Sequence, residues 1–214
     1  MTWFADEVIA PANRRVLRAV EADPLLAPFA YHLTAPGVFE NCPEEGLVVI
    51  RPVCDPGPDN FPAAWYDEPV LDWQSFQQCD CPPLLIGIDR VAEICSCEPT
   101  DLPPVSLLAY LKAFAARTQS TIIFYSCFMW GGDIETERVW VFDNSEVVLV
   151  SVSQEGTPSQ RRTAVLEPEG IVHHDPGGPL VLALQSIKVF LKSPHFTPHT
   201  RSFPWQNYKL VQTK

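Results

Sequence analysis

The sequence has no run of about 18 apolar residues, which is the length that a membrane-spanning helix needs. Its first eleven residues contain Asp6 and Glu7, where a secretory signal peptide would carry positive charge. We therefore expect a cytoplasmic protein that has no membrane partner.

Basic residues are scarce. The chain has 15 Lys and Arg against 26 Asp and Glu, which gives a formal net charge of −11. Because nucleic-acid binding is driven largely by Lys and Arg, this composition argues against a nucleic-acid partner. A surplus of negative charge instead favours fast encounter with a basic protein. The same surplus is also typical of proteins that are acidic for solubility alone.

The sequence lacks the local motifs of several enzyme classes. It has no G-x-S-x-G, no H-E-x-x-H and no phosphate-binding loop, and the pairs Gly131–Gly132 and Gly177–Gly178 do not have the spacing of such a loop. A catalytic Cys–His pair depends on spatial arrangement, and no cysteine stands out as a nucleophile. We predict no catalytic residue and no cofactor.

Proline, in contrast, is abundant, with 22 residues in 214. The prolines lie mainly in 24–69, 82–104 and 176–204, where we expect long, rigid connections because proline cannot donate to a β-ladder. The stretch from about 52 to 104 is a Pro- and Trp-rich excursion. No repeat or clear boundary divides the chain, so we expect residues 1–214 to form a single globular domain.

The clearest structural pattern lies in the middle of the chain. Apolar residues at a spacing of three and four predict an amphipathic helix over 104–118. A β-branched and aromatic run follows at 121–130, Gly131–Gly132 breaks it, and apolar runs at 138–143 and 146–152 come next. These elements predict an α+β fold, in which an antiparallel sheet packs with a few helices and is joined by long Pro-rich connections.

Weaker patterns predict further elements. We expect helices at 11–22 and 180–191, with a strand as the alternative for 180–191, and short strands at 47–50, 84–88 and 162–166. The tail at 203–211 should dock on the domain, because free tails seldom contain both Trp and Tyr.

Four of the seven cysteines form two closely spaced C-x-C pairs: Cys79 with Cys81, and Cys95 with Cys97. In an extended segment the two sulfurs of a pair point to one face, which makes the four thiols a candidate zinc site. A one-residue gap strains chelation, however, since zinc ligands usually lie two to four residues apart. Disulfides and reduced core cysteines are the alternatives, and a cytosolic compartment favours the reduced form.

The histidines gather late in the chain, at His173, His174, His195 and His199, with Asp175 after the first pair. Imidazoles and a carboxylate suit zinc or iron. The last two histidines have the spacing of one helix face, but the prolines before each of them disfavour a helix. Asp175-Pro-Gly-Gly is also an ordinary turn, so surface histidines are the alternative to a metal site.

An acidic cluster follows the Gly-Gly turn, at Asp133, Glu135 and Glu137. Alternate spacing on a strand predicts that the three carboxylates share one face, close to Trp130. Paired carboxylates suit acid–base catalysis or cation binding, and a solvated hairpin has the same pattern. An aromatic anchor beside negative charge suits a protein-binding hot spot better, so these four are our candidate partner-binding residues.

The segment Phe124-Tyr-Ser-Cys-Phe-Met-Trp-Gly-Gly-Asp-Ile-Glu-Thr-Glu-Arg-Val-Trp-Val-Phe142, which follows the amphipathic helix, resembles small acidic orphan proteins of bacteria. Some of these are immunity proteins, which neutralise a cognate toxin. The resemblance implies an α+β, non-enzymatic binder, and it assigns no functional residues.

Two hypotheses of function follow. The first is a soluble, non-enzymatic protein-interaction module, with an immunity protein or inhibitor as one form of it, that binds a basic partner. The second is a metal-binding enzyme with zinc or iron, or a zinc-stabilised domain, that uses the C-x-C pairs or the late histidines. Elemental analysis of the purified protein separates the two.

Overall fold

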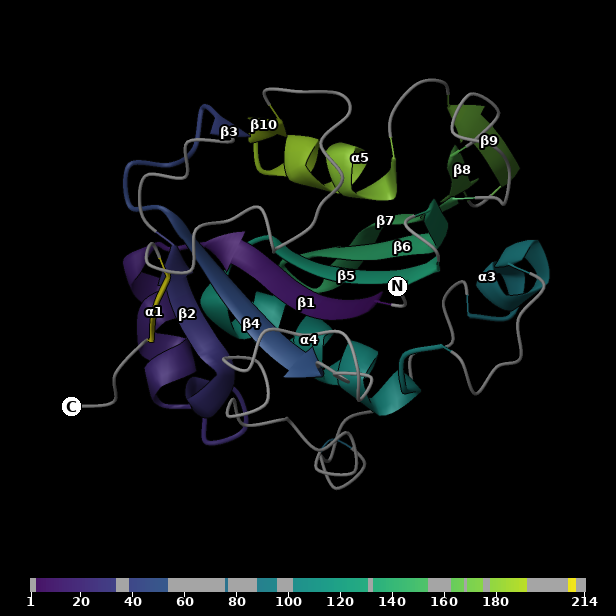
Figure 1. Cartoon of the computed structure of the whole chain (residues 1–214). Coiled ribbons are helices and arrows are strands. Elements are labelled where there is room, and N and C mark those ends of the chain that lie inside the picture. Colours follow the sequence, from purple (N-terminus) through teal and green to yellow (C-terminus); the bar gives the residue numbers. More distant parts are fainter. Residues whose placement is uncertain are drawn as a thin grey trace.

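A large antiparallel sheet with helices on both faces is the frame of this computed structural model (Figure 1). The structure describes residues 3–33, 39–53, 76, 88–95, 102–130, 133–153, 163–167, 169–174, 178–191 and 208–210. The strands are β1 (Trp3–Pro11), β2 (Ala30–Leu33), β3 (Phe39–Glu40), β4 (Leu47–Val53), β5 (Ile122–Trp130), β6 (Asp133–Asp143), β7 (Glu146–Ser153), β8 (Thr163–Glu167), β9 (Gly170–His174), β10 (Phe190–Leu191) and β11 (Tyr208–Leu210). The helices are α1 (Arg14–Glu21), α3 (Ile88–Cys95), α4 (Val105–Thr118) and α5 (Pro179–Ser186), with a 3-10 turn, η1 (Ala27–Phe29).

The main sheet has nine strands in the order β11-β2-β4-β1-β5-β6-β7-β8-β9, with antiparallel neighbours throughout. The N-terminal strand β1 therefore lies in the interior of the sheet, between β4 and β5. Strands β5 to β9 pair in chain order, as consecutive strands commonly do. Strands β3 and β10 form a separate two-stranded sheet. This architecture confirms the predicted α+β fold with an antiparallel sheet.

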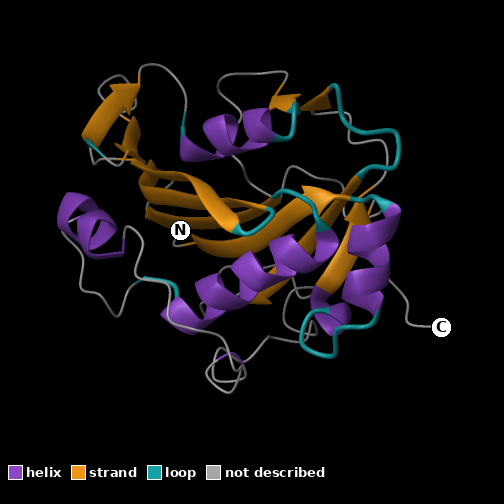
Figure 2. Ribbon diagram, turned by 180° about the vertical axis from the view of Figure 1, so that it is seen from behind, coloured by secondary structure: helices purple, strands orange, loops and turns teal. Residues whose placement is uncertain are grey.

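Helices α1 and α4 cover one face of the sheet (Figures 1 and 2). Helix α4 begins after Pro104 and ends at Gln119, which adopts the left-handed conformation that stops a helix (φ 51°). Its apolar side buries Leu107, Leu111 and Phe114 against the sheet. Leu111 and Phe124 of β5 are both fully buried in one apolar cluster, so the predicted packing of this helix is confirmed for β5 and β6.

Helix α1 is tied to α4 by polar contacts at the ends of the two helices. The Asn13 side chain accepts hydrogen bonds from the backbone amides of Arg15 and Val16, both at 3.0 Å, and so caps α1. Its Nδ2 donates to Ser120 Oγ, 2.7 Å away, just beyond α4. These contacts fix the start of α1 beside the end of α4.

Helix α5 covers the opposite face of the sheet (Figure 1). Pro179 occupies its first turn, where a missing N–H costs nothing. Leu180, Ala183 and Leu184 pack on apolar side chains of the sheet, among them Ile123 and Val139. Each face of the sheet is thus covered by helix and has its own apolar cluster.

The remaining predicted elements are matched to different degrees. The strands expected at 47–50 and 162–166 are present as β4 and β8, and the C-terminal tail docks as β11 on β2. The helix expected over 180–191 ends at Ser186 and gives way to β10. Of the strand expected at 84–88, residues 84–87 lie outside the described residues, and Ile88 begins helix α3 instead. In the described ranges, no helix has both the length and the apolar character that crossing a membrane requires.

Candidate functional site

Polar side chains, most of them buried, gather toward one end of strands β1, β5 and β6, where β1 begins and β5 turns into β6. We call this group the polar end of the sheet. Backbone register places its members side by side: Asp6 opposite Ser126, Glu7 opposite Tyr125, Ser126 opposite Arg138, and Cys127 opposite Glu137. Since neighbouring residues of a strand point to opposite faces, the group divides into one row under α4 and another under α5.

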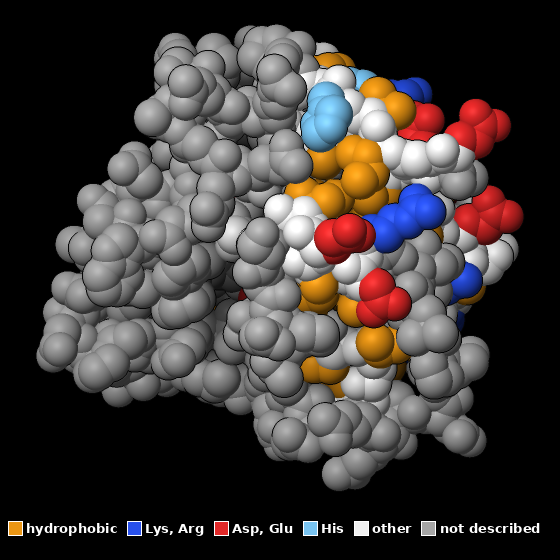
Figure 3. All heavy atoms as spheres, turned by 90° about the vertical axis from the view of Figure 1, so that its right-hand side faces the viewer, with side chains coloured by type: hydrophobic (Ala, Val, Ile, Leu, Met, Phe, Trp, Pro, Cys, Tyr) orange, Lys and Arg blue, Asp and Glu red, His pale blue; other side chains and the backbone are white. Residues whose placement is uncertain are grey.

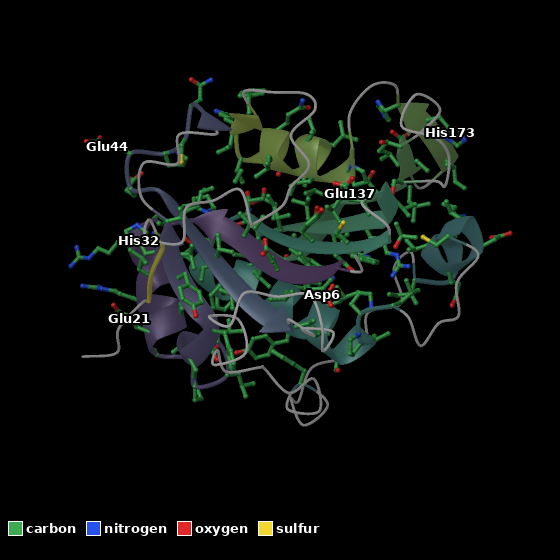
Figure 4. The ribbon with its side chains drawn as sticks, in the orientation of Figure 1. Asp6, Glu21, His32, Glu44, Glu137 and His173 are labelled. Atoms are coloured by element: carbon green, nitrogen blue, oxygen red, sulfur yellow. The ribbon has the colours of Figure 1, made fainter. Side chains whose placement is uncertain are left out.

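The row on the α4 side consists of Asp6, Ser126 and Arg138, in register with one another across three strands. Burial raises the pKa of the Asp6 carboxyl to about 6, and a hydrogen bond from the Ser126 side chain and the charge of Arg138 partly oppose that rise. Arg138 is itself buried. Asp6 lies on β1, on the side of the sheet away from Glu137 (Figure 4). This carboxyl therefore titrates near neutral pH.

The row on the α5 side contains Glu7, Tyr125, Cys127 and Glu137, all at most 4 % exposed. Burial raises the pKa of the Tyr125 hydroxyl well above its ordinary value, and the neighbouring Cys127, Glu137 and Glu7 raise it further. The phenol therefore keeps its proton under all ordinary conditions. Two buried carboxyl groups lie near this one phenol.

Glu137 connects the sheet to helix α5. Its Oε1 accepts a hydrogen bond from the backbone N–H of Leu180, at 3.1 Å, in the first turn of the helix. The residue at the N-cap position, Gly178, has no side chain with which to cap this turn, so a carboxylate from β6 does so instead. A carboxylate at a helix N-terminus also interacts favourably with the helix dipole.

Gly178 leaves room for this contact. A Cβ atom at position 178 would lie 2.7 Å from Glu137 Oε2 and 3.2 Å from Oε1. The backbone of Gly178 is extended (φ −68°), a conformation that any residue adopts. Glycine is therefore required here for close approach and not for backbone freedom.

Glu137, one of the four candidate partner-binding residues, is buried in the structure and caps α5. The backbone of β6 does not keep the regular alternation on which the predicted shared face of Asp133, Glu135 and Glu137 depends. Thr136 pairs with Phe128 and Ile134 with Met129, so the register shifts at Glu135, and the strict alternation is broken there. The side chains of Trp130, Asp133 and Glu135 lie outside the described residues, and their role in partner binding stays a prediction.

Few of the residues of the metal hypothesis lie in the described part of the chain. Cys95 is buried at the end of helix α3, and not in the extended segment that the C-x-C geometry assumed. His173 and His174 are exposed on β9. The other proposed ligands lie outside the described residues: Cys79, Cys81, Cys97, Asp175, His195 and His199. Among the residues that are described, no three His, Cys, Asp or Glu side chains come together as metal ligands.

Sequence reasoning missed Asp6, Glu7 and Arg138. The available signal was two adjacent acids inside an apolar segment, Trp-Phe-Ala-Asp-Glu-Val-Ile-Ala, that has the composition of a strand. In a buried strand, adjacent residues point to opposite faces, so each face receives one carboxyl group. Such an arrangement predicts polar partners on the neighbouring strands, because buried charges need them.

A second region with functional character is the β8–β9 hairpin, which ends the sheet. Ile171 and Val172 of β9 are 44 % and 40 % exposed, although both are large apolar residues. At the tip of the hairpin, Glu167 and Glu169 are exposed as well. Figure 3 faces the side of the molecule where β8, β9 and α3 lie, and shows histidine, apolar and charged side chains together at the surface.

The fold and these two regions define an α+β protein with a buried polar group and an exposed sheet edge. Comparison of the chain with protein-family profiles, with curated proteins and with solved structures found no match. Function must therefore be argued from the geometry.

Proposed function

We propose that this protein is a soluble, non-enzymatic interaction module that binds a basic protein partner in the cytoplasm, with an immunity-type inhibitor as the specific form. The β8–β9 hairpin is the observation that carries this proposal. It combines exposed apolar side chains with exposed carboxylates in a chain whose formal net charge is −11.

The two kinds of side chain have different roles in such an interface. The apolar pair Ile171 and Val172 supplies surface that gains free energy when a partner removes it from water. The carboxylates of Glu167 and Glu169, together with the negative charge of the whole chain, accelerate encounter with a positively charged surface. Trp130, Asp133 and Glu135, on the β5–β6 hairpin, remain the alternative contact surface.

The experiment measures association and dissociation rates between the full chain and the purified products of the genes that flank its own. We expect a basic protein among them to bind, with an association rate that falls steeply as the salt concentration rises. Replacing Glu167 and Glu169 by Lys should slow association far more than it accelerates dissociation. The matched control replaces the exposed Asp89 and Glu93 of α3 by Lys. It changes the net charge by the same amount as the replacement of Glu167 and Glu169 does.

Two results decide between the contact surfaces. If the β8–β9 hairpin is the contact surface, Ile171→Ala and Val172→Ala together should weaken binding by at least about 2 kcal/mol, and Trp130→Ala should leave it unchanged. The reverse pattern would move the interface to the β5–β6 hairpin. Salt-insensitive binding, or a partner that is acidic, would contradict the proposed function itself.

A further inference from the structure

We propose that the partner docks by strand addition: an extended segment with alternating β-branched residues and a basic carboxyl end pairs antiparallel with β9. The inference rests on the proposed function, because it takes a basic partner as given and assigns how that partner is held. Strand β9 is the outermost strand of the nine-stranded sheet.

One edge of β9 is unpaired in the part of the chain that the structure describes. Among the described strands it has one neighbour, β8, with which it pairs from Gly170 to His174 without a register shift. An edge strand presents every second N–H and C=O group away from its neighbour, so it is a template for another strand. All four residues from Ile171 to His174 are exposed, which means that neither face of the strand is covered.

The first half of β7 is another exposed part of the sheet, and it is less suited to pairing than β9. Pairing of β7 with β8 covers only Ser151 to Ser153, which leaves the first half of β7 without a partner on that side among the described strands. That half contains a register shift against β6, because Phe142 pairs with Val147 and Val141 with Leu149. The extra residue is Val148, which is 52 % exposed. A bulge of this kind prevents regular pairing, whereas β9 has none.

The charges along β9 determine the orientation and chemistry of the added segment. Antiparallel pairing, which all described neighbours in the sheet show, would place the carboxyl end of the segment beside Gly170 and the acidic tip. Lys or Arg at that end would meet Glu167 and Glu169. Alternate residues of the segment would lie beside Ile171 on one face and Val172 on the other, which favours β-branched side chains. A second copy of this chain brings a further charge of −11, and repulsion opposes it.

The test uses the full chain, labelled with 15N, and the synthetic peptide acetyl-Thr-Val-Thr-Val-Lys-Lys-amide as the probe. We expect chemical-shift changes concentrated in β8 and β9, and slower hydrogen exchange at alternate amides of β9. A peptide with N-methyl groups on the amides that face β9 keeps the same side chains, and should bind at least about tenfold more weakly because the ladder hydrogen bonds are lost. A third peptide, with Glu in place of Lys, should bind more weakly at low salt only.

Chain variants complete the test. The chain variants are Ile171→Asp and Val172→Asp, both at exposed positions of β9, and each should abolish the shift changes. Val148→Asp, at an equally exposed apolar residue on the bulged strand, should bind the peptide as the wild type does.

Equal binding of the N-methylated peptide, or shift changes that lie away from β9, would overturn strand addition. So would a dimer in sedimentation that Val172→Asp dissociates, since the occupant would then be a second copy. If a basic protein partner binds but leaves β9 exchange unchanged, strand addition fails while the proposed function stands.

Discussion

Helices α4 and α5 cover opposite faces of one sheet, but they are held there by different interactions. Helix α4 has fourteen residues and buries a broad apolar side that includes Leu107, Leu111 and Phe114. Helix α5 has eight residues, and a buried carboxylate, Glu137, caps its first turn. The long helix depends on apolar area, whereas the short one adds a specific polar contact that its own sequence does not provide.

The difference shows what each kind of attachment depends on. Apolar packing is spread over many side chains, each contributing about 1.5–3 kcal/mol when fully buried, so the position of α4 does not depend on any single residue. The attachment of α5 includes one hydrogen bond from Leu180 to a charged acceptor, and the close approach of Gly178 to the same carboxylate. The effects of substitutions on stability should therefore differ between the two faces, both in size and in how specific they are to one contact.

The largest effect is expected on the α4 face. Leu111→Ala or Phe124→Ala should lower the free energy of unfolding by about 2–5 kcal/mol, because each removes a fully buried side chain and leaves a cavity. Urea denaturation followed by circular dichroism measures the loss. Ala116→Ser, at an exposed position of the same helix, is the control and should change stability little. A loss below about 1 kcal/mol at both positions would contradict the packing of α4.

The α4 face is also the part of the fold that the sequence predicts best. Its apolar residues recur with the helical period, and the three strands after it are β-branched and aromatic, so local pattern and tertiary structure agree. The same reasoning fails at β1. Asp6 and Glu7 interrupt its apolar pattern. A segment that contains two adjacent acids does not predict an interior strand of a sheet. Only the register with β5 and β6 shows that both acids have polar neighbours.

The polar site is less predictable still, because its contacts join residues that are far apart in the chain. Glu137 and Leu180 are 43 positions apart, and nothing in either local sequence indicates the pair. A β-bulge at Glu135 further alters the face that simple alternation assigns to the acids before it. Side-chain period is informative within a regular element and loses its meaning across an irregularity of one residue.

The next effect concerns the α5 cap. Glu137→Ala should lower the free energy of unfolding by about 2 kcal/mol, because the Leu180 N–H is left buried without its charged acceptor. Glu137→Gln retains an acceptor oxygen and should lose less. Hydrogen exchange at the Leu180 amide should accelerate in the Ala variant, while exchange in α4 changes only with global stability. Unchanged exchange at Leu180 would show that Glu137 does not cap α5.

A smaller effect is expected from Asp6, and it depends on pH. The folded-state pKa of about 6 lies above the ordinary value of 3.8, so the folded protein binds the proton more tightly than the unfolded chain does. The contribution of the Asp6 carboxyl to the free energy of unfolding is therefore fully present below pH 3.8, and it is lost as the pH rises through about 6. Asp6→Asn should be more stable than the wild type at pH 7 by about 1–2 kcal/mol, and the difference should shrink toward pH 4.

The measurement for Asp6 is the urea midpoint of both proteins across that pH range. Glu146→Gln, at an exposed acid of β7, is the control and should follow the wild-type profile. Because Arg138 and Ser126 favour the charged form of Asp6, Arg138→Met should make stability depend more steeply on pH than in the wild type. A pH profile that is identical in the wild type and Asp6→Asn would show that this carboxyl titrates normally.

The smallest effect tests the contact between α5 and the sheet most specifically. Gly178→Ala should lower stability by about 1–2 kcal/mol in the wild-type background, because the new Cβ atom lies 2.7 Å from Glu137 Oε2 and forces one of the two to move. The backbone conformation of Gly178 is compatible with alanine, so no conformational strain contributes.

In the Glu137→Ala background the clashing carboxylate is absent. The same Gly178→Ala substitution should there be neutral or stabilising, since alanine restricts the unfolded chain more than glycine does. A double-mutant cycle on urea denaturation gives the coupling between the two positions directly. Additive losses would mean that Glu137 and Gly178 do not meet, and that the apolar side chains of α5 hold it on the sheet without this contact.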